Sequence, residues 1–390
     1  MKSTKIIATE IKNYLFSNLP QKAGDYEARA KELRQKGYKI TADTVRHYYR
    51  RAGKTLNKVH LSQGGDEEMN KVKLFDYNKL SNSLLNLVKQ ERPEIHLPQM
   101  RKHKNSKLTE QAVLHLSDIH YGKMNYFFDT NLNKRILTYS PNIFVQEMNR
   151  MIDGITTIND LLLGGYNLEV LNILTTGDLV DNELIYRGQH KFVEEGVISQ
   201  VLSITSYLKQ MIIEMLKLFP KVRMVIVGGN HSRLTSIPEA DWDYNNFDYL
   251  IGKVLQIIFA GEKRVEMVVP DSWYYVDSIY RWKYLMHHGN TVFSWMSMPY
   301  YGIVRQSKAR RLEMPYDIEL IGHFHPSQIL QIPTSSHSLT IVDGCWIEKD
   351  TLSWKKYATL STAKQLYFGV STKRPMTWAF PLDLTTNNNQ

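Results

Sequence analysis

The stretch AVLHLSDIH at residues 112–120 is the most informative segment of this sequence. It begins with mostly apolar residues, which is typical of a short buried strand, and leads directly into Asp118 and His120. Downstream, short apolar strands alternate with longer helical stretches, which predicts an α/β sheet with its functional sites at strand ends. We expect strands at 112–116, 168–175, 222–228, 282–287 and 317–321, and helices at 141–163, 196–218, 242–259 and 291–312.

Each of the five expected strands is followed by a cluster of Asp, Asn or His. Spacings such as Asp-x-His let alternate side chains point toward one common site. Carboxylate, amide and imidazole groups suit Mn²⁺, Fe or Zn²⁺, and the neighbouring glycines permit a close approach of the backbone. His115, within the first strand, is better explained as a packing residue. The clusters are Asp118-Ile-His120, Gly177-Asp178-Leu-Val-Asp181-Asn182, Gly229-Asn230-His231, His287-His288-Gly289 and Gly322-His323-Phe-His325.

In this order the clusters resemble those of the calcineurin-like metallophosphoesterases, over roughly residues 112–345. The resemblance implies a four-layer αββα sandwich built on two mixed sheets. It also implies two divalent metal ions about 3.5–4 Å apart, most simply Mn²⁺, with Fe or Zn²⁺ as alternatives. One ion would be held by Asp118, His120 and His325 and the other by Asn230, His288 and His323, with Asp178 bridging them.

The same resemblance implies that His231 is a catalytic group rather than a ligand. It would protonate the leaving oxygen or stabilise the transition state, and Asp181 would orient it. The alternative for Asp181 is a cap at the end of a strand.

The fourth cluster leaves two alternatives, because His287 and His288 are adjacent and only one of them can face the site from a strand. The general His-Gly pattern of the superfamily selects His288. Its DNA-repair exonucleases place His two residues before Gly, which would select His287. We expect His288 to be the ligand.

Two positions depart from the phosphoprotein phosphatases of this superfamily, which carry Arg after the second Asp and an acid after Gly-Asn-His. This chain has Asn182 and Ser232 there. The Arg that would grip a phosphomonoester dianion is therefore missing from its usual place, which favours phosphodiesters. Arg233 or Arg187 is the candidate replacement for substrate binding, and the alternative is that either is a surface residue.

The formal charge is concentrated in one part of the chain. Of the net charge of +10 on 390 residues, residues 1–110 carry +11, so the remainder is close to neutral. A basic arm on a near-neutral body predicts a polyanionic partner, most simply nucleic acid. The alternative is a solvated, Lys-rich face.

Residues 1–52 are expected to form a small all-α domain of three helices. Within it, ARAKELRQKGYKITADTVRHYYRR at 28–51 resembles a helix-turn-helix unit, with Ala30 and Leu33 packing the first helix and Thr41–Arg51 as the recognition helix. Arg46, Arg50 and Arg51 would face outward to bind DNA, although a protein-contact module is the alternative. We expect a connector with an amphipathic helix and a basic run at 53–110, the catalytic domain at 111–384 and a disordered tail at 385–390.

Together these features predict a metal-dependent phosphodiesterase of the cytoplasm that acts on DNA, that is, a nuclease. No stretch approaches the roughly 20 apolar residues of a membrane span, and the single cysteine, Cys345, excludes an internal disulfide and is expected to be a buried thiol. The alternative function is a phosphomonoesterase or cyclic-nucleotide phosphodiesterase acting on small molecules. A homodimer fits this prediction, and so does an ATPase partner, which related repair nucleases use.

Overall fold

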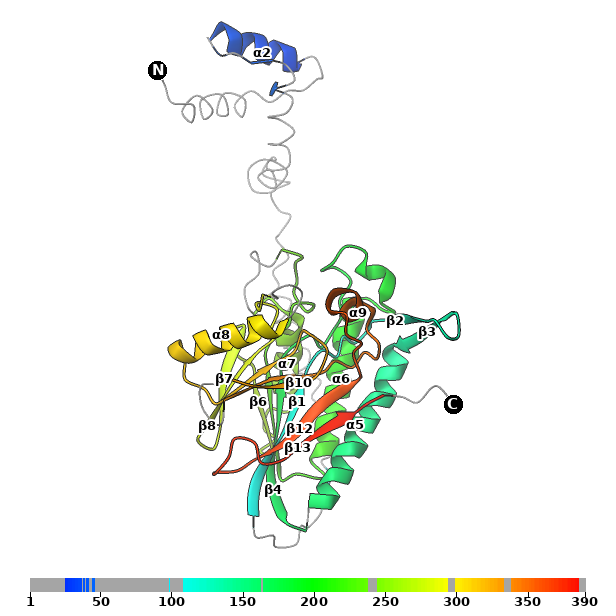
Figure 1. Cartoon of the computed structure of the whole chain (residues 1–390), viewed down its shortest axis with the longest axis vertical. Helices are drawn as coiled ribbons and strands as arrows, with labels where there is room; N and C mark the ends of the chain where they lie inside the picture. The colour runs from blue at the N-terminus through cyan, green and yellow to red at the C-terminus, as the bar shows by residue number, and fades with distance from the viewer. Residues whose placement is uncertain are drawn as a thin grey trace. The chain divides into compact units, whose positions relative to one another are not determined.

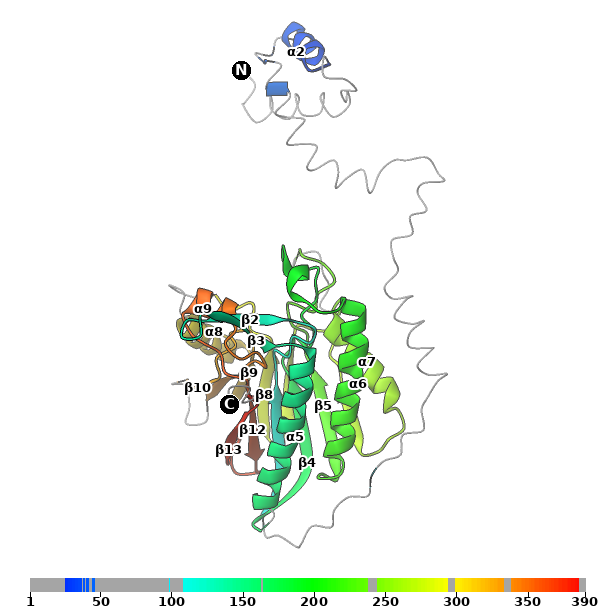
Figure 2. The same ribbon diagram turned by 90° about the vertical axis from the view of Figure 1, so that its right-hand side faces the viewer.

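Two β-sheets lie face to face in the larger part of the computed structural model (Figures 1 and 2). The structure describes residues 25–36, 38, 40–41, 44–45, 98, 108–162, 164–237, 244–293, 299–332 and 338–385. The chain divides into two units, residues 1–79 and residues 80–390. The predicted limits of the arm, connector, catalytic domain and tail remain predictions.

The first sheet contains six strands in the order β13-β12-β1-β4-β5-β6. Strands β1, β4, β5 and β6 run parallel, whereas β12 is antiparallel to both β1 and β13. The carboxyl ends of the parallel strands therefore meet at one edge. The strands are β1 (Leu108–Leu116), β4 (Tyr166–Thr175), β5 (Lys221–Ile226), β6 (Val265–Val268), β12 (Lys364–Val370) and β13 (Ala379–Asp383).

The second sheet contains five strands in the order β10-β11-β9-β8-β7. Its central strands β8, β9 and β11 are parallel, and the edge strands β7 and β10 are antiparallel to their neighbours. Both sheets are thus mixed, as the sequence predicts. The strands are β7 (Tyr274–Ile279), β8 (Trp282–His287), β9 (Ile318–Ile321), β10 (Gln328–Gln331) and β11 (Leu339–Val342).

Alternation along β1 shows how the layers stack. Ala112, Leu114 and Leu116 pack with helices α5 (Pro141–Leu162), α6 (Val197–Met215) and α7 (Phe247–Ile258), whereas Val113 faces the second sheet. On the far side of the second sheet, Ile303 of helix α8 (Pro299–Glu313) packs against Ile321 and Val342. The order helices, sheet, sheet, helix confirms the predicted four-layer αββα sandwich.

Three smaller elements complete this unit. Strands β2 (Asn125–Asp129) and β3 (Lys134–Tyr139) form a hairpin, and the short helix α9 (Thr351–Tyr357) packs against β2 (Figure 1). A 3₁₀ turn, η2, spans Gln189–Phe192. The sequence did not predict these elements, because each is too short for a hydrophobic period.

The five predicted strands correspond to β1, β4, β5, β8 and β9, but two predicted helix starts are too early. Helix α7 begins at Phe247 rather than 242, and α8 at Pro299 rather than 291. Proline suits the first turn of a helix and not its interior, which explains why α8 starts there. Residues 238–243 and 294–298 lie outside the described chain.

In the first unit the structure describes helix α2 (Asp25–Gln35) and parts of residues 38–45. Ala30, Leu33 and Val45 are buried, and Thr41 Oγ1 accepts a hydrogen bond from the Thr44 N–H at 3.2 Å, as expected of a helix cap. Arg46, Arg50 and Arg51 lie outside the described residues, so their DNA-binding role and the helix-turn-helix module remain predictions.

Cys345 is buried, as predicted, and its thiol donates to the Ile347 carbonyl at 3.2 Å. His115 is also buried, 3.0 Å from the Thr176 hydroxyl, in agreement with a packing role. None of the helices that the structure describes has the length and apolar character needed to cross a membrane.

Candidate metal centre

Seven side chains from five strand ends converge at one edge of the two sheets. All except the half-buried His323 are buried. We call them the seven-residue cluster: Asp118 and His120 after β1, Asp178 after β4, Asn230 after β5, His288 after β8, and His323 and His325 after β9.

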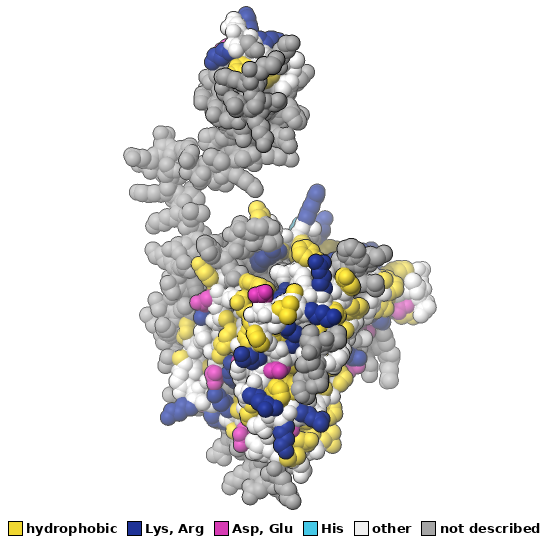
Figure 3. Space-filling model, turned by 60° about the vertical axis from the view of Figure 1, so that its left-hand side comes forward, with side chains coloured by type: hydrophobic (Ala, Val, Ile, Leu, Met, Phe, Trp, Pro, Cys, Tyr) yellow, Lys and Arg dark blue, Asp and Glu magenta, His cyan; other side chains and the backbone are white. Residues whose placement is uncertain are grey.

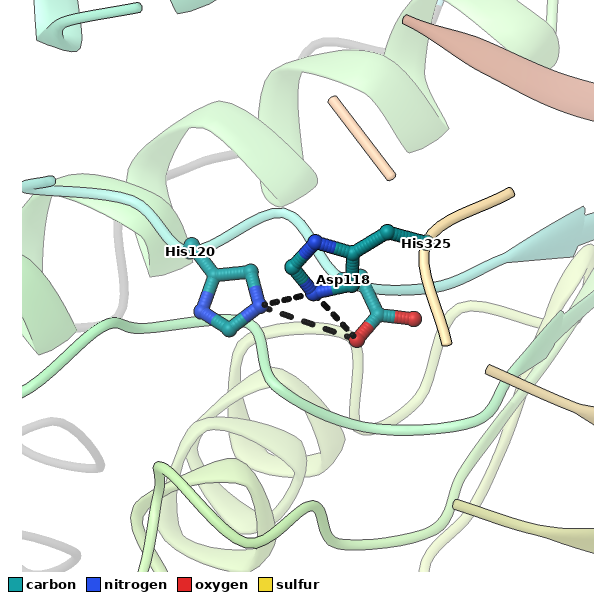
Figure 4. Close-up of side chains that lie close together, drawn as sticks. All are labelled: Asp118, His120 and His325. Carbon is teal, nitrogen blue, oxygen red and sulfur yellow. Dashed lines mark hydrogen bonds and ion pairs between the residues drawn. The ribbon is translucent and has the colours of Figure 1, made fainter. Parts of the chain in front are cut away.

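The first group of donor atoms belongs to Asp118, His120 and His325, whose side chains lie close together (Figure 4). The Nε2 atoms of the two histidines are 3.3 Å apart, and they lie 3.6 and 3.7 Å from Asp118 Oδ1. Each ring has its other nitrogen 3.0 Å from a carboxylate oxygen, His120 on Asp181 and His325 on Asp350. Because these Nδ1–H groups donate to carboxylates, neutral rings present lone pairs at Nε2. Lone pairs this close to each other and to Asp118 Oδ1 favour a cation between them.

The second group is centred on His288. Its Nδ1–H donates to the Thr176 carbonyl at 2.8 Å, and its Nε2 lies 3.1 Å from Asp178 Oδ2 and 3.3 Å from His323 Nδ1. The same Asp178 oxygen lies 3.9 Å from His120 Nε2 in the first group. Asp178 is therefore shared by both groups, which is the position that a bridging ligand needs.

Two buried oxygen atoms of the cluster have no hydrogen-bond partner within the described part of the chain. They are Asp118 Oδ1 and Asn230 Oδ1. The Asn230 amide nitrogen is used, since it donates to the Tyr186 hydroxyl at 2.9 Å. An orphaned buried acceptor costs about 1–3 kcal/mol, so two in one cluster require an explanation. A divalent cation fits, because carboxylate and amide oxygens are hard donors, and the Asp118 oxygen lies beside the ring nitrogens of His120 and His325.

The electrostatics also favour a cation. Although burial raises the pKa of Asp178, the neighbouring His288 and His231 hold it well below its usual range. Burial lowers the pKa of His120, but the neighbouring carboxylates of Asp118, Asp181 and Asp178 raise it to about 10. The cluster therefore favours the binding of cations, and a metal ion competes with protons for the same ligand atoms.

The backbone at the cluster is strained in a way that points to function. Five of its residues adopt left-handed φ values, which cost about 1–3 kcal/mol each for residues other than Gly. Neighbouring glycines permit the close packing: a Cβ on Gly229 would lie 2.1 Å from Asp178 Oδ1, and one on Gly322 2.2 Å from Asp118 Oδ2. The φ values are 50° at Asp118, 49° at His120, 56° at Asp178, 70° at His323 and 71° at His325.

His231 and Asp181 lie beside the cluster. The Asp181 carboxylate oxygen is 3.2 Å from His231 Nδ1 and 3.0 Å from His120 Nδ1, so this one side chain can orient both rings. His231 also has a ring nitrogen within 4.8 Å of ligand atoms of His120 and Asp178, which leaves a ligand role open to it.

His287 points away from the cluster, although it is adjacent to His288. Its Nε2 lies 2.9 Å from Glu319 Oε1 and 2.9 Å from the Arg310 guanidinium. The structure therefore brings His288, and not His287, to the candidate metal centre.

The predicted substrate-binding arginines occupy different places. Arg187 is exposed and lines the cleft above the cluster. Arg233 is half-buried, and its Nε–H donates to the Asn230 carbonyl at 2.9 Å. The Asn182 side-chain amide donates to the carbonyls of His231 and Arg233 at 3.1 and 3.0 Å.

Two carboxylates that support the cluster were not predicted. Asp350 orients His325 and also caps α9 by accepting the Ser353 N–H at 3.0 Å. Asp248 accepts the N–H groups of Asp178 and Gly229, each at 2.9 Å, and so fixes two of the cluster-bearing loops. Neither carboxylate belongs to one of the sequence clusters, because the groups that each one contacts are distant from it in the chain.

A cleft of about 1330 Å³ opens above the cluster. Asp178, Asn230, His231, His323 and His325 are among the residues lining it, so a bound molecule can reach the donor atoms. Its other walls come from the β2–β3 hairpin, residues 186–192 and helix α9.

A scan against models of protein families finds no match. Among curated proteins, the SPbeta prophage-derived uncharacterized protein YonJ of Bacillus subtilis (strain 168) is 21% identical over 235 residues, covering 59% of this chain and 54% of that protein. The chain thus spans about half the length of this relative.

Two solved structures illustrate the structural similarity. Wild-type Vps29 from Entamoeba histolytica, complexed with Zn²⁺, is 11% identical over 70% of this chain and 100% of its own, with a TM-score of 0.30. A metallophosphoesterase from Sphaerobacter thermophilus is 13% identical over 72% of this chain and 89% of its own, with a TM-score of 0.31. At these identities and scores, the similarities by themselves assign no activity to this chain.

Proposed function

We propose that this chain is a two-metal phosphodiesterase that cleaves DNA. The observation that carries the proposal is the Asp178 carboxylate, which lies 3.1 Å from His288 Nε2 in one donor group and 3.9 Å from His120 Nε2 in the other. Two divalent ions held there would polarise the phosphoryl oxygens and lower the pKa of an attacking water. Mn²⁺ suits the mixed oxygen and nitrogen donors, as do Fe and Zn²⁺.

The protein groups around this centre supply orientation and a proton. His231 lines the cleft and faces Asp181, so it can hold the proton that the leaving oxygen takes up. Asp181 and Asp350 fix the rings of His120 and His325 through Nδ1. Arg187 lies on the cleft wall, where it can pair with a phosphate oxygen, whereas Arg233 holds the Asn230 loop in place.

Two observations favour a DNA phosphodiester over a small phosphomonoester. Asn182 replaces the Arg that grips a dianionic phosphate, and its side chain is used in the loop itself. The net charge of +11 on residues 1–110 is of no use to an enzyme for small molecules, but it increases affinity for a polyanion. Figure 3 shows more basic than acidic side chains on one face of the larger unit.

A substrate panel tests the proposal. Purified protein with Mn²⁺ is incubated with labelled single-stranded, double-stranded and nicked DNA, beside an aryl phosphodiester and an aryl phosphomonoester. We expect cleavage of DNA and of the aryl phosphodiester. Preference for the phosphomonoester, with no DNA cleavage, would instead support the small-molecule alternative.

A triple variant tests the arm. Each Lys or Arg paired with a phosphate contributes about −0.9 to the slope of log affinity against log salt on duplex DNA. Changing Arg46, Arg50 and Arg51 to Gln should flatten that slope by about two to three. An unchanged slope would indicate that the arm contacts protein rather than DNA.

A further inference from the structure

The walls of the cleft above the seven-residue cluster carry exposed aromatic rings, which are costly to leave in water. Four of them come from three segments distant in sequence: the β2–β3 hairpin, the turn η2 and helix α9. We call these four the rim aromatics: Tyr126, Phe128, Phe192 and Trp354, with exposed fractions of 43%, 49%, 55% and 49%. A fifth ring, Tyr186, is 47% exposed, but its hydroxyl accepts the Asn230 amide at the cluster.

The charged side chains that line the cleft are arranged by sign: the acidic ones are buried, and the exposed ones are basic. Asp178, Asp181 and Asp350 line the cleft but are buried in and around the cluster. The exposed charged residues that line it are all basic, namely Arg135, Arg187, Lys191, Lys355 and Lys356. The cleft therefore offers cations and aromatic faces at its rim and donor atoms at its floor.

The rim is held together by hydrogen bonds. The Met124 N–H donates to the Phe192 carbonyl at 2.7 Å, which joins η2 to the start of β2. The Asn125 amide donates to the Lys349 carbonyl at 3.1 Å, which joins β2 to the segment before α9. On the hairpin, alternation places Tyr126 and Phe128 on one face, and Arg135 is the cross-strand partner of Phe128. The segments that carry the rim aromatics are thus joined to one another before any ligand arrives.

We infer that this cleft binds an unpaired nucleic-acid strand, whose bases stack on the rim aromatics while its phosphates pair with the rim cations. Basic grooves with aromatic platforms are how proteins bind single strands without sequence preference. Stacking requires bases that are free of a partner strand, so a duplex cannot use these rings. The inference rests on the proposed function and specifies its substrate as a single strand, an overhang or a frayed end.

Binding is measured by fluorescence anisotropy of labelled dT12, U12 and a 12-base-pair duplex with the full chain in EDTA, which stops the proposed hydrolysis. Trp354→Ala or Phe192→Ala should weaken binding of the single strands by roughly 5- to 150-fold, while binding of the duplex stays the same. Trp354→Phe should restore most of the affinity. The matched control is Phe293→Ala, because Phe293 is 82% exposed and does not line the cleft; it should change nothing.

The salt dependence separates stacking from charge. Trp354→Ala should lower affinity without altering the salt slope, whereas Lys355→Gln with Lys356→Gln should flatten the slope on dT12 by about 1.4.

The two labelled strands distinguish DNA from RNA. Equal losses of affinity for dT12 and U12 would indicate that the cleft binds either kind of strand, and a loss for dT12 alone would indicate a DNA strand. The inference is overturned if neither strand binds, if the aromatic variants leave strand binding intact, or if Phe293→Ala weakens it equally. The binding assay requires no hydrolysis, so a negative result in it does not count against the metal centre. Cleavage of the aryl phosphodiester tests the metal centre separately.

Discussion

Two groups of mostly buried polar side chains flank the end of β8, and they differ in how their charges are balanced. The Glu319 cluster consists of His287, Arg310, Glu319 and Thr340, and its carboxylate accepts from Arg310 at 3.0 Å and from the Thr340 hydroxyl at 2.9 Å. The seven-residue cluster has two buried acceptors without partners among the described residues. In the first group the Arg310 guanidinium balances the Glu319 carboxylate, and the atom without a partner among the described residues is a ring nitrogen, His287 Nδ1. In the second group the atoms without partners are a carboxylate oxygen and an amide oxygen.

Burial alone therefore does not make a histidine a candidate metal ligand; its ring nitrogen must also face other candidate ligand atoms, as His288 Nε2 faces Asp178 Oδ2. His287 and His288 are adjacent and both are buried, yet His287 is paired with Glu319 and His288 faces Asp178. Four predictions test the difference.

The largest effect is expected for Asp178→Ala. Without the shared carboxylate, two cations would repel each other at short range, so hydrolysis of every substrate should disappear and bound metal should fall below two per chain. Metal analysis and the aryl phosphodiester assay measure both quantities. Full activity in this variant would contradict a two-metal centre.

His288→Ala and His287→Ala form a matched pair. We expect His288→Ala to lose metal and activity, because it removes the Nε2 that faces Asp178. His287→Ala should keep its metal while unfolding at a lower urea concentration, because it removes a buried partner of Glu319. The reverse pattern would transfer the ligand role to His287.

His231→Ala should lower turnover by roughly 10²–10⁴, the usual contribution of general acid catalysis, with metal content unchanged. Metal analysis of the same preparation is the control. Loss of metal would make His231 a ligand, which its closeness to His120 and Asp178 allows.

The smallest effect concerns stability. Although burial raises the pKa of Glu319, its hydrogen bond to His287 and the charge of Arg310 lower it from 4.5 to about 2. A carboxylate with a lowered folded-state pKa stabilises the protein above pH 4.5, and this contribution disappears as the pH falls toward 2. Glu319→Gln should therefore lower the free energy of unfolding by about 3 kcal/mol at pH 7 and by much less near pH 2. Urea titrations at both pH values measure the difference, and an equal loss at each pH would exclude the charge as its cause.

The motifs predicted the fold and the convergence of the seven-residue cluster because each lies directly after a strand, where the topology brings it to one edge. The sequence could not choose between His287 and His288, since their environments depend on Glu319 and Thr176, which are distant in the chain. It also gave no sign of Asp248 and Asp350, which act through backbone N–H groups and ring nitrogens.

The most direct test of the metal centre is anomalous diffraction from crystals of the Mn²⁺-loaded protein at the manganese edge. We predict two peaks about 3.5–4 Å apart, one among Asp118, His120 and His325, the other among Asn230, His288 and His323, with Asp178 between them. A map with no peak at these residues, or with a single peak, would contradict the two-metal centre.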